Sequence, residues 1–163
     1  MKVTLHAICL IIAVALAPTL FAFLKIFGVK ANIFLIYVII AGFYATKQES
    51  IWLGLIFGLV YDITVGKAIG VCGILYMLAG FFTVLICENL IRRSNALVVM
   101  LCTAVGTVIF EGIQGLVRSL FVDNIGFLYS LRVIGTEAVF NGVVAFLLYI
   151  PLNRVFRRIC DNN

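Results

Sequence analysis

Five ionisable residues lie inside long apolar stretches of the sequence, and they are the first candidates for chemistry: Asp62, Glu111, Arg118, Arg132 and Glu137. A charge at membrane depth costs a few kcal/mol on insertion scales, so each of these side chains needs either a partner or a function. With Lys67 they make three acids and three bases, and this balance favours internal ion pairs that fix helix register. A solute site or a proton relay stays open as the alternative.

Two of these acids share a helix face with other polar residues. Glu111 and Arg118 are about 10 Å apart along a helix axis, with Gln114 between them as a bridge. Glu137 and Asn141 are one helical turn apart and likewise share a face. We therefore expect an intramembrane polar network made of Glu111, Gln114, Arg118, Arg132, Glu137 and Asn141.

Motifs for catalysis or for cofactor binding are missing from the sequence. It contains no glycine-rich phosphate loop, no H-E-x-x-H and no G-x-S-x-G. The single histidine, His6, has no carboxylate or second histidine at a metal-ligand spacing, and the five cysteines lack C-x-x-C spacing. We predict a protein that is not an enzyme and that needs no cofactor or metal.

Membrane-spanning helices are the elements that would position these residues. Of the 163 residues, 64% are hydrophobic and 12% are charged, which leaves little material for a soluble domain. We predict a single integral membrane domain over residues 1–163, an all-α compact bundle of about six transmembrane helices over 4–24, 31–46, 50–65, 68–87, 96–119 and 131–152. Only Lys47 to Ser50 separate the second and third runs, so a re-entrant hairpin is the alternative to two full spans.

The basic residues favour a topology with both termini in the cytoplasm. With the N-terminus inside, more Lys and Arg residues fall inside than outside. The net charge of +5 then reflects membrane orientation rather than nucleic-acid binding. Arg154, Arg157 and Arg158 fall at helical spacing in the tail, where they would anchor this orientation or contact anionic lipid headgroups.

Small residues recur at four-residue spacing in three places, which lets helix backbones approach closely. In a chain with 14 glycines, internal packing is the default explanation, and a partner helix or a homo-oligomer stays open. A terminal helix is often peripheral, so a partner fits the first span better than the others. The pairs are Ala13 with Ala17, Gly54 with Gly58, and Gly66 with Gly70.

The segment from Gly54 to Tyr76 reads GLIFGLVYDITVGKAIGVCGILY. Its frame of Gly54, Gly58, Asp62, Gly66, Gly70 and Tyr76 resembles the signature of the MreD family, the rod shape-determining membrane proteins of bacteria. The closing stretch also resembles that family, through Glu137, Asn141, Pro151, Leu152 and Arg154. The resemblance covers nearly the whole chain, with Ala31 and Ala68 standing where the family often has proline.

The resemblance implies a non-enzymatic subunit of the cell-elongation complex in the bacterial cytoplasmic membrane. Its expected partners are MreC, MreB, and RodA with its penicillin-binding partner, and its expected role is to dock MreC and help assemble the peptidoglycan synthesis machinery. One hypothesis is that a partner helix uses the first span or the Gly54/Gly58 face, so that Gly58→Leu abolishes co-isolation of MreC while expression survives. Asp62 is expected to cap a helix start, to pair with Lys67, or to contact a partner.

A solute-binding protein is the alternative function. The MreD family is thought to be similar to the substrate-binding subunits of energy-coupling-factor vitamin transporters, which also have six spans and meet a transport subunit through small residues of the first helix. Ala13 and Ala17 would fit that interface, and the polar residues would line a vitamin pocket. The balanced charges and short outer loops argue against this alternative. An ion channel or pump would need a polar stripe through the inner half, which the sequence lacks.

Overall fold

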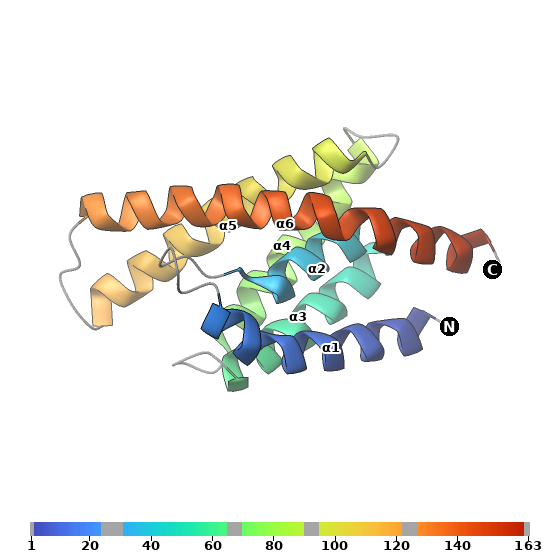
Figure 1. Cartoon of the computed structure of the whole chain (residues 1–163), viewed down its shortest axis with the longest axis horizontal. Helices are drawn as coiled ribbons and strands as arrows, with labels where there is room; N and C mark the ends of the chain where they lie inside the picture. Colours follow the sequence, from blue (N-terminus) through green and yellow to red (C-terminus); the bar gives the residue numbers. More distant parts are fainter. Residues whose placement is uncertain (1, 24–30, 65–69, 90–94, 122–126, 162–163) are drawn as a thin grey trace.

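The computed structural model describes residues 2–23, 31–64, 70–89, 95–121 and 127–161 of the chain. Figure 1 shows the helices packed into one bundle, with both termini at the same end. The predicted all-α bundle is therefore confirmed. In the described residues the chain forms six α-helices and no strand: α1 (Lys2–Phe23), α2 (Ile33–Gly42), α3 (Lys47–Thr64), α4 (Val71–Asn89), α5 (Ala96–Phe121) and α6 (Phe127–Asp161).

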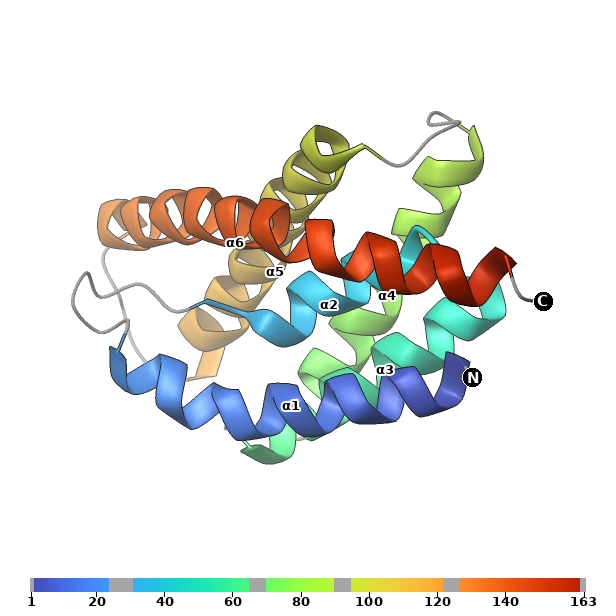
Figure 2. The ribbon, with the colours of Figure 1, turned by 45° about the vertical axis from the view of Figure 1, so that its right-hand side comes forward.

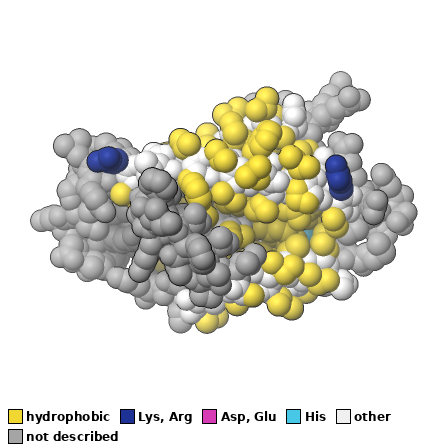
Figure 3. All heavy atoms as spheres, in the orientation of Figure 1, with side chains coloured by type: hydrophobic (Ala, Val, Ile, Leu, Met, Phe, Trp, Pro, Cys, Tyr) yellow, Lys and Arg dark blue, Asp and Glu magenta, His cyan; other side chains and the backbone are white. Residues whose placement is uncertain are grey.

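The helices differ in how well they could cross a membrane. Three stretches are long and apolar enough by length and composition: Val71–Asn89 of α4, Ala96–Leu116 of α5 and Arg132–Phe156 of α6. The described apolar stretch Thr4–Ala15 of α1 and the whole of α2 are shorter. Figure 3 shows that hydrophobic side chains form a broad band across the middle of one face of the molecule, with basic side chains toward its two ends. This is the surface pattern expected of a protein surrounded by lipid.

Helix α2 differs from the full span expected over 31–46. It has ten residues and rises about 15 Å, roughly half the thickness of the hydrocarbon core of a bilayer. Every residue from Phe34 to Gly42 is buried, because α2 packs against α3, α4, α5 and α6 and α1 also touches it. Figures 1 and 2 show α2 in the middle of the bundle. A helix that is apolar on all sides is stable either inside a protein or in lipid, and here the other helices enclose α2.

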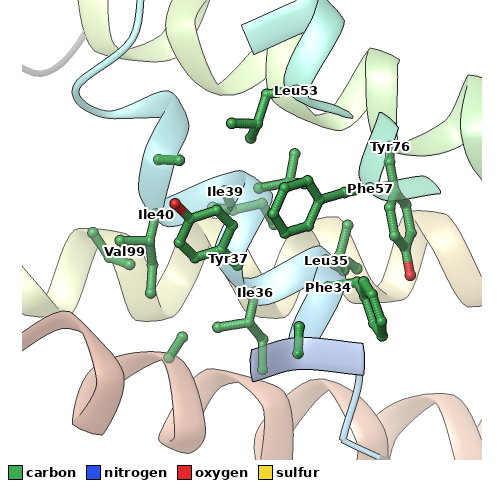
Figure 4. Packing of buried hydrophobic residues seen from close by; sticks show 14 of the residues in the cluster. Phe34, Leu35, Ile36, Tyr37, Ile39, Ile40, Leu53, Phe57, Tyr76 and Val99 are labelled. Atoms are coloured by element: carbon green, nitrogen blue, oxygen red, sulfur yellow. The ribbon is translucent and has the colours of Figure 1, made fainter. Parts of the chain in front are cut away.

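Aromatic rings fix α2 against α3. Tyr37 stacks on Phe57 with ring centroids 4.9 Å apart, and Phe34 meets Phe57 edge to face at 6.4 Å. Figure 4 shows these rings with Leu53 and Tyr76 around the α2 helix. Because lipid is as apolar as these side chains, the contacts stabilise the bundle through close packing rather than through removal from water.

Helix α6 is the longest element, and it continues past the expected end of the sixth span at residue 152. It runs through Pro151, which membrane helices tolerate where neighbours satisfy the freed carbonyl. The extension brings Asn153 and Phe156 against Tyr44, which follows α2. The Tyr44 hydroxyl donates to Oδ1 of Asn153 at 2.7 Å, and the Tyr44 and Phe156 rings stack at 4.8 Å. The start of the chain joins the same contact, since the rings of His6 and Phe156 lie 6.0 Å apart.

A capping box starts α3. The backbone N–H of Glu49 donates to Oγ1 of Thr46 at 3.3 Å, and the backbone N–H of Thr46 donates to Oε2 of Glu49 at 2.9 Å. Helix α3 therefore begins at Lys47, inside the stretch that was expected to separate two spans. Only the short turn from Phe43 to Thr46 joins α2 to α3.

Replacing Thr46 with alanine removes the side-chain acceptor of this box. We expect the free energy of unfolding to fall by about 1 kcal/mol, the usual cost of losing such a cap. Thermal unfolding of the purified protein in detergent measures the change. Thr46→Ser retains the hydroxyl and should stay close to the wild type; equal losses in both variants would contradict a capping role.

Candidate functional site

Four buried polar residues from three helices and the start of α2 form one hydrogen-bonded cluster, called here the Asn32 cluster: Asn32, Tyr76, Thr107 and Asn141. The Tyr76 hydroxyl donates to Oδ1 of Asn32 at 2.6 Å, and the backbone N–H of Asn32 donates to Oδ1 of Asn141 at 3.0 Å. Nδ2 of Asn141 donates to Oγ1 of Thr107 at 3.2 Å. No member is more than 6% exposed. The cluster fixes the N-terminal end of α2 to α4, α5 and α6.

Asn141 is the one residue of the predicted polar network that also belongs to the Asn32 cluster. Gln114 instead donates from Nε2 to Sγ of Cys72 at 2.9 Å. Glu137 is buried and Glu111 is half-buried, and both make interactions inside the protein. Arg132 is exposed, and the side chain of Arg118 lies outside the described residues. The ion pairs expected among these residues therefore stay a prediction.

Sequence reasoning missed Asn32 and Thr107 as members of a site. Asn32 had a signal, because an asparagine directly before an apolar helical run is typical of an N-cap. Its Oδ1 does accept from the backbone N–H of Leu35 at 3.1 Å, as an N-cap does. Thr107 had no signal: its hydroxyl donates to the carbonyl of Thr103 in the preceding turn, which any helical threonine can do.

Gly54 and Gly58 are the points where α3 meets α4. A Cβ added to Gly58 would lie 2.6 Å from Cα of Gly73 and 2.8 Å from the carbonyl carbon of Cys72. A Cβ added to Gly54 would lie 2.7 Å from the carbonyl carbon of Tyr76. Real Cβ atoms do not approach backbone this closely, so only glycine permits the contact. Because α4 occupies this face, the Gly54/Gly58 pair serves internal packing, and a partner helix does not have access to it.

Asp62 closes the end of this pair of helices at which α3 ends and α4 begins. Its Oδ2 accepts from the backbone N–H groups of Gly70, Cys72 and Gly73 at 2.7, 3.1 and 3.3 Å. These are donors of the first turn of α4 and of the residue that precedes it, so the carboxylate satisfies orphan N–H groups and faces the positive end of the helix dipole. The side chain is 2% exposed. Of the three expected roles, the structure supports the helix cap; Lys67 lies outside the described residues.

Gly70 does not pack a helix, although its spacing from Gly66 suggested a second small-residue pair. It has a φ of 101° and lies in the turn before α4, and a Cβ added there would meet nothing within 4 Å. The residue is glycine because L side chains rarely adopt this backbone conformation. Gly66 lies outside the described residues.

Helix α1 contributes Ala13 to the interior of the bundle. Ala13 is 3% exposed, so its face of α1 packs inward, while the side chain of Ala17 lies outside the described residues. Nearer the N-terminus, Nδ1 of His6 and the Tyr37 hydroxyl share a hydrogen bond of 2.8 Å. The opposite face of α1 exposes Ile8, Ile11 and Ile12.

Three glycines within the described helices have no packing reason among the described residues. A Cβ added to Gly112 or Gly115 of α5, or to Gly135 of α6, would meet nothing within 4 Å. Gly112 is half-buried and lies along the exposed apolar stripe of α5, which consists of Leu101, Val105, Ile109 and Leu116. A helical glycine costs roughly 1 kcal/mol relative to alanine, so an unpacked one inside a span calls for an explanation outside the chain.

The side chains described above pack helices together and form hydrogen bonds between them. Among the described residues, no group of three or more His, Cys, Asp or Glu side chains is placed to hold a metal ion. Lys47 and Glu88 form an ion pair of 2.7 Å, which is half exposed and joins the start of α3 to the end of α4. The polar groups described above instead fix helices to one another.

Comparison with known proteins gives one result. The family model described as rod shape-determining protein MreD matches residues 1–159. No curated protein and no solved structure matches the chain. The match covers the Gly54 to Tyr76 segment and the last helix, where the sequence resembles that family.

Proposed function

Because the chain belongs to the MreD family of rod shape-determining membrane proteins, we propose that it is a non-enzymatic subunit of the cell-elongation complex that docks MreC. The family is one of shape-determining membrane proteins and is not known as a family of enzymes. The match over residues 1–159 is the observation that carries the proposal. In this role the protein helps assemble MreB, RodA and the penicillin-binding partner of RodA around MreC.

The exposed stripe of α5 is the docking face in this proposal. Helix α5 packs mainly on α6, so its opposite side is open to the membrane. Leu101, Val105 and Leu116 are each more than half exposed along that side. Gly112 lies among them and lets the backbone of a single transmembrane helix, such as that of MreC, approach within contact distance. A partner there would explain a glycine that packs against nothing in its own chain.

Replacing Gly112 with leucine tests this docking face. We expect co-isolation of MreC from native membranes to fall at least about tenfold, because the new side chain would hold the two helices apart and about 1.4 kcal/mol of binding is one factor of ten. The variant should keep its expression and thermal stability, since nothing lies within 4 Å of the added Cβ. Crosslinking followed by quantitative mass spectrometry measures the partners.

Gly135→Leu is the matched control. It makes the same change at a second open glycine, on α6 rather than α5, and should retain MreC. Equal loss from both variants would contradict a face confined to α5. Recovery of a second copy of this chain at the α5 face, in place of MreC, would make the face a homo-oligomer contact. Recovery of transporter ATPases would favour solute uptake.

The placement of the protein in the cell is part of the proposal. It would lie in the bacterial cytoplasmic membrane with both termini in the cytoplasm, and Figure 1 shows the two termini at one end of the bundle, as an even number of crossings requires. Arg154 is exposed at that end, where it would contact anionic lipid headgroups with Arg157 and Arg158.

A further inference from the structure

Nδ2 of Asn32 is a buried hydrogen-bond donor without an acceptor among the residues that the structure describes. Asn32 is 6% exposed, and its Nδ2 and Oγ of Ser50 are the buried side-chain atoms of the described residues that lack a partner. Ser50 offers no space for a ligand, because a Cβ added to the facing Gly80 would lie 2.7 Å from its Oγ. Asn32 is different, since its Oδ1 caps a ten-residue helix while its Nδ2 lies on the other side of the amide.

The orientation of the Asn32 amide is fixed by its neighbours. Oδ1 accepts from the backbone N–H of Leu35 at 3.1 Å and from the Tyr76 hydroxyl at 2.6 Å. Turning the amide over would place its NH₂ group against the N–H of Leu35, two donors facing each other. Nδ2 therefore stays on the far side of the amide with both of its protons to donate.

The rest of the Asn32 cluster provides no acceptor for these protons. Oδ1 of Asn141 accepts from the backbone N–H of Asn32, and Oγ1 of Thr107 accepts from Nδ2 of Asn141. The Thr107 hydroxyl in turn donates to the carbonyl of Thr103 at 2.8 Å. None of these oxygens accepts a bond from Nδ2 of Asn32, which leaves this donor without a partner in the cluster. A ligand at this place must supply an acceptor.

The surroundings favour a neutral ligand. The start of α2 has a partial positive charge that would attract an anion. Against this, removing an ion from water into the bundle interior costs far more than one hydrogen bond from a neutral amide returns.

We propose that the N-terminal end of α2 binds one neutral oxygen acceptor through Nδ2 of Asn32. The acceptor is a water molecule, or the hydroxyl or carbonyl oxygen of a lipid or other uncharged molecule. Buried waters in proteins commonly satisfy such orphaned groups, and an organic oxygen offers the same chemistry. The site is separate from the α5 docking face and does not depend on it.

Nuclear magnetic resonance of the full chain tests the proposal. The protein is deuterated, labelled with ¹⁵N at asparagine, and placed in nanodiscs of phosphatidylcholine and phosphatidylglycerol. Loss of a signal in Asn32→Asp assigns the side-chain amide; Asn32→Ser gives the assignment if the first variant does not fold. The exposed Asn89 amide, which donates to the carbonyl of Leu85 at 2.9 Å, is the internal reference.

We expect an Asn32 amide proton in wild-type protein to show a hydrogen-bonded shift and a cross-peak to a proton outside the protein. A cross-peak at the water frequency identifies water, and one that appears only with protonated lipid identifies a lipid oxygen. A cross-peak to neither, from an organic molecule carried through purification, identifies a solute. An unbonded shift without any external cross-peak, or a bond to another group of this chain, would overturn the proposal.

Discussion

Replacing Gly58 with leucine is expected to prevent the chain from folding. Any Cβ at this position meets the backbone of Cys72 and Gly73, which cannot move aside as a flexible side chain can. Relief requires α3 and α4 to separate along most of their shared length, so the loss of unfolding free energy should exceed the roughly 1–3 kcal/mol typical of overpacked cores. Fluorescence-detected size-exclusion chromatography of tagged protein in detergent measures the folded fraction.

Substitutions of different size at Gly58 distinguish a steric clash between α3 and α4 from the loss of a partner. Gly58→Ala should lower the unfolding temperature without abolishing folding, because its single methyl group allows a smaller separation of the helices. Gly112→Leu serves as the control for adding a leucine where nothing lies within 4 Å. Well-folded Gly58→Leu protein that fails only to bring down MreC would contradict internal packing, and would restore the docking hypothesis drawn from the sequence.

The helices could be predicted from the sequence because apolar runs of sufficient length have few other structures open to them in a membrane. The spans predicted for α4, α5 and α6 begin and end within a few residues of the observed helices, except at the C-terminal end of α6. The start of α3 was missed, although Thr46 and Glu49 form the spacing of a capping box. That signal lies in the sequence and would have moved the boundary from residue 50 to residue 47.

The central position of α2 could not be predicted in the same way. Its sequence, IFLIYVIIAG, is as apolar as that of a lipid-facing helix. Such a surface is stable both in the interior of the bundle and against lipid, so the sequence does not distinguish the two positions. What distinguishes the buried helix is the set of contacts it makes with the five other helices. The same limit applied to the Gly54/Gly58 pair, where the spacing predicts close approach of a helix but does not identify which helix approaches.

The Asn32 cluster could be predicted only in part from residue types. Asn141 was identified because it shares a helix face with Glu137, yet its partners Asn32 and Thr107 come from segments 109 and 34 residues away in the sequence. Single-sequence reasoning has no access to such pairings. It also gave priority to charged residues, whereas the bonds that fix α2 come from neutral ones.

Replacing Asp62 with alanine should destabilise the end of the bundle at which α3 ends and α4 begins. The carboxylate accepts from three backbone N–H groups, and a buried donor left unsatisfied costs about 1–3 kcal/mol. We expect the free energy of unfolding to fall by about 3 kcal/mol or more, since three donors lose their acceptor together. Thermal unfolding in detergent measures the loss, and protease sensitivity between α3 and α4 would show whether this end of the bundle opens first.

Asp62→Asn separates the hydrogen bonds from the charge. The amide keeps one acceptor oxygen but presents an NH₂ group to the remaining donors, so its stability should fall between those of the wild type and Asp62→Ala. Complementation of rod shape in cells that lack their own copy is the companion measurement. Normal thermal stability of Asp62→Ala with lost shape control would contradict the capping role and would indicate a partner contact. Parallel loss of stability and shape would place Asp62 with Gly58 among the residues that hold α3 and α4 together, and so make the fold itself the requirement for docking.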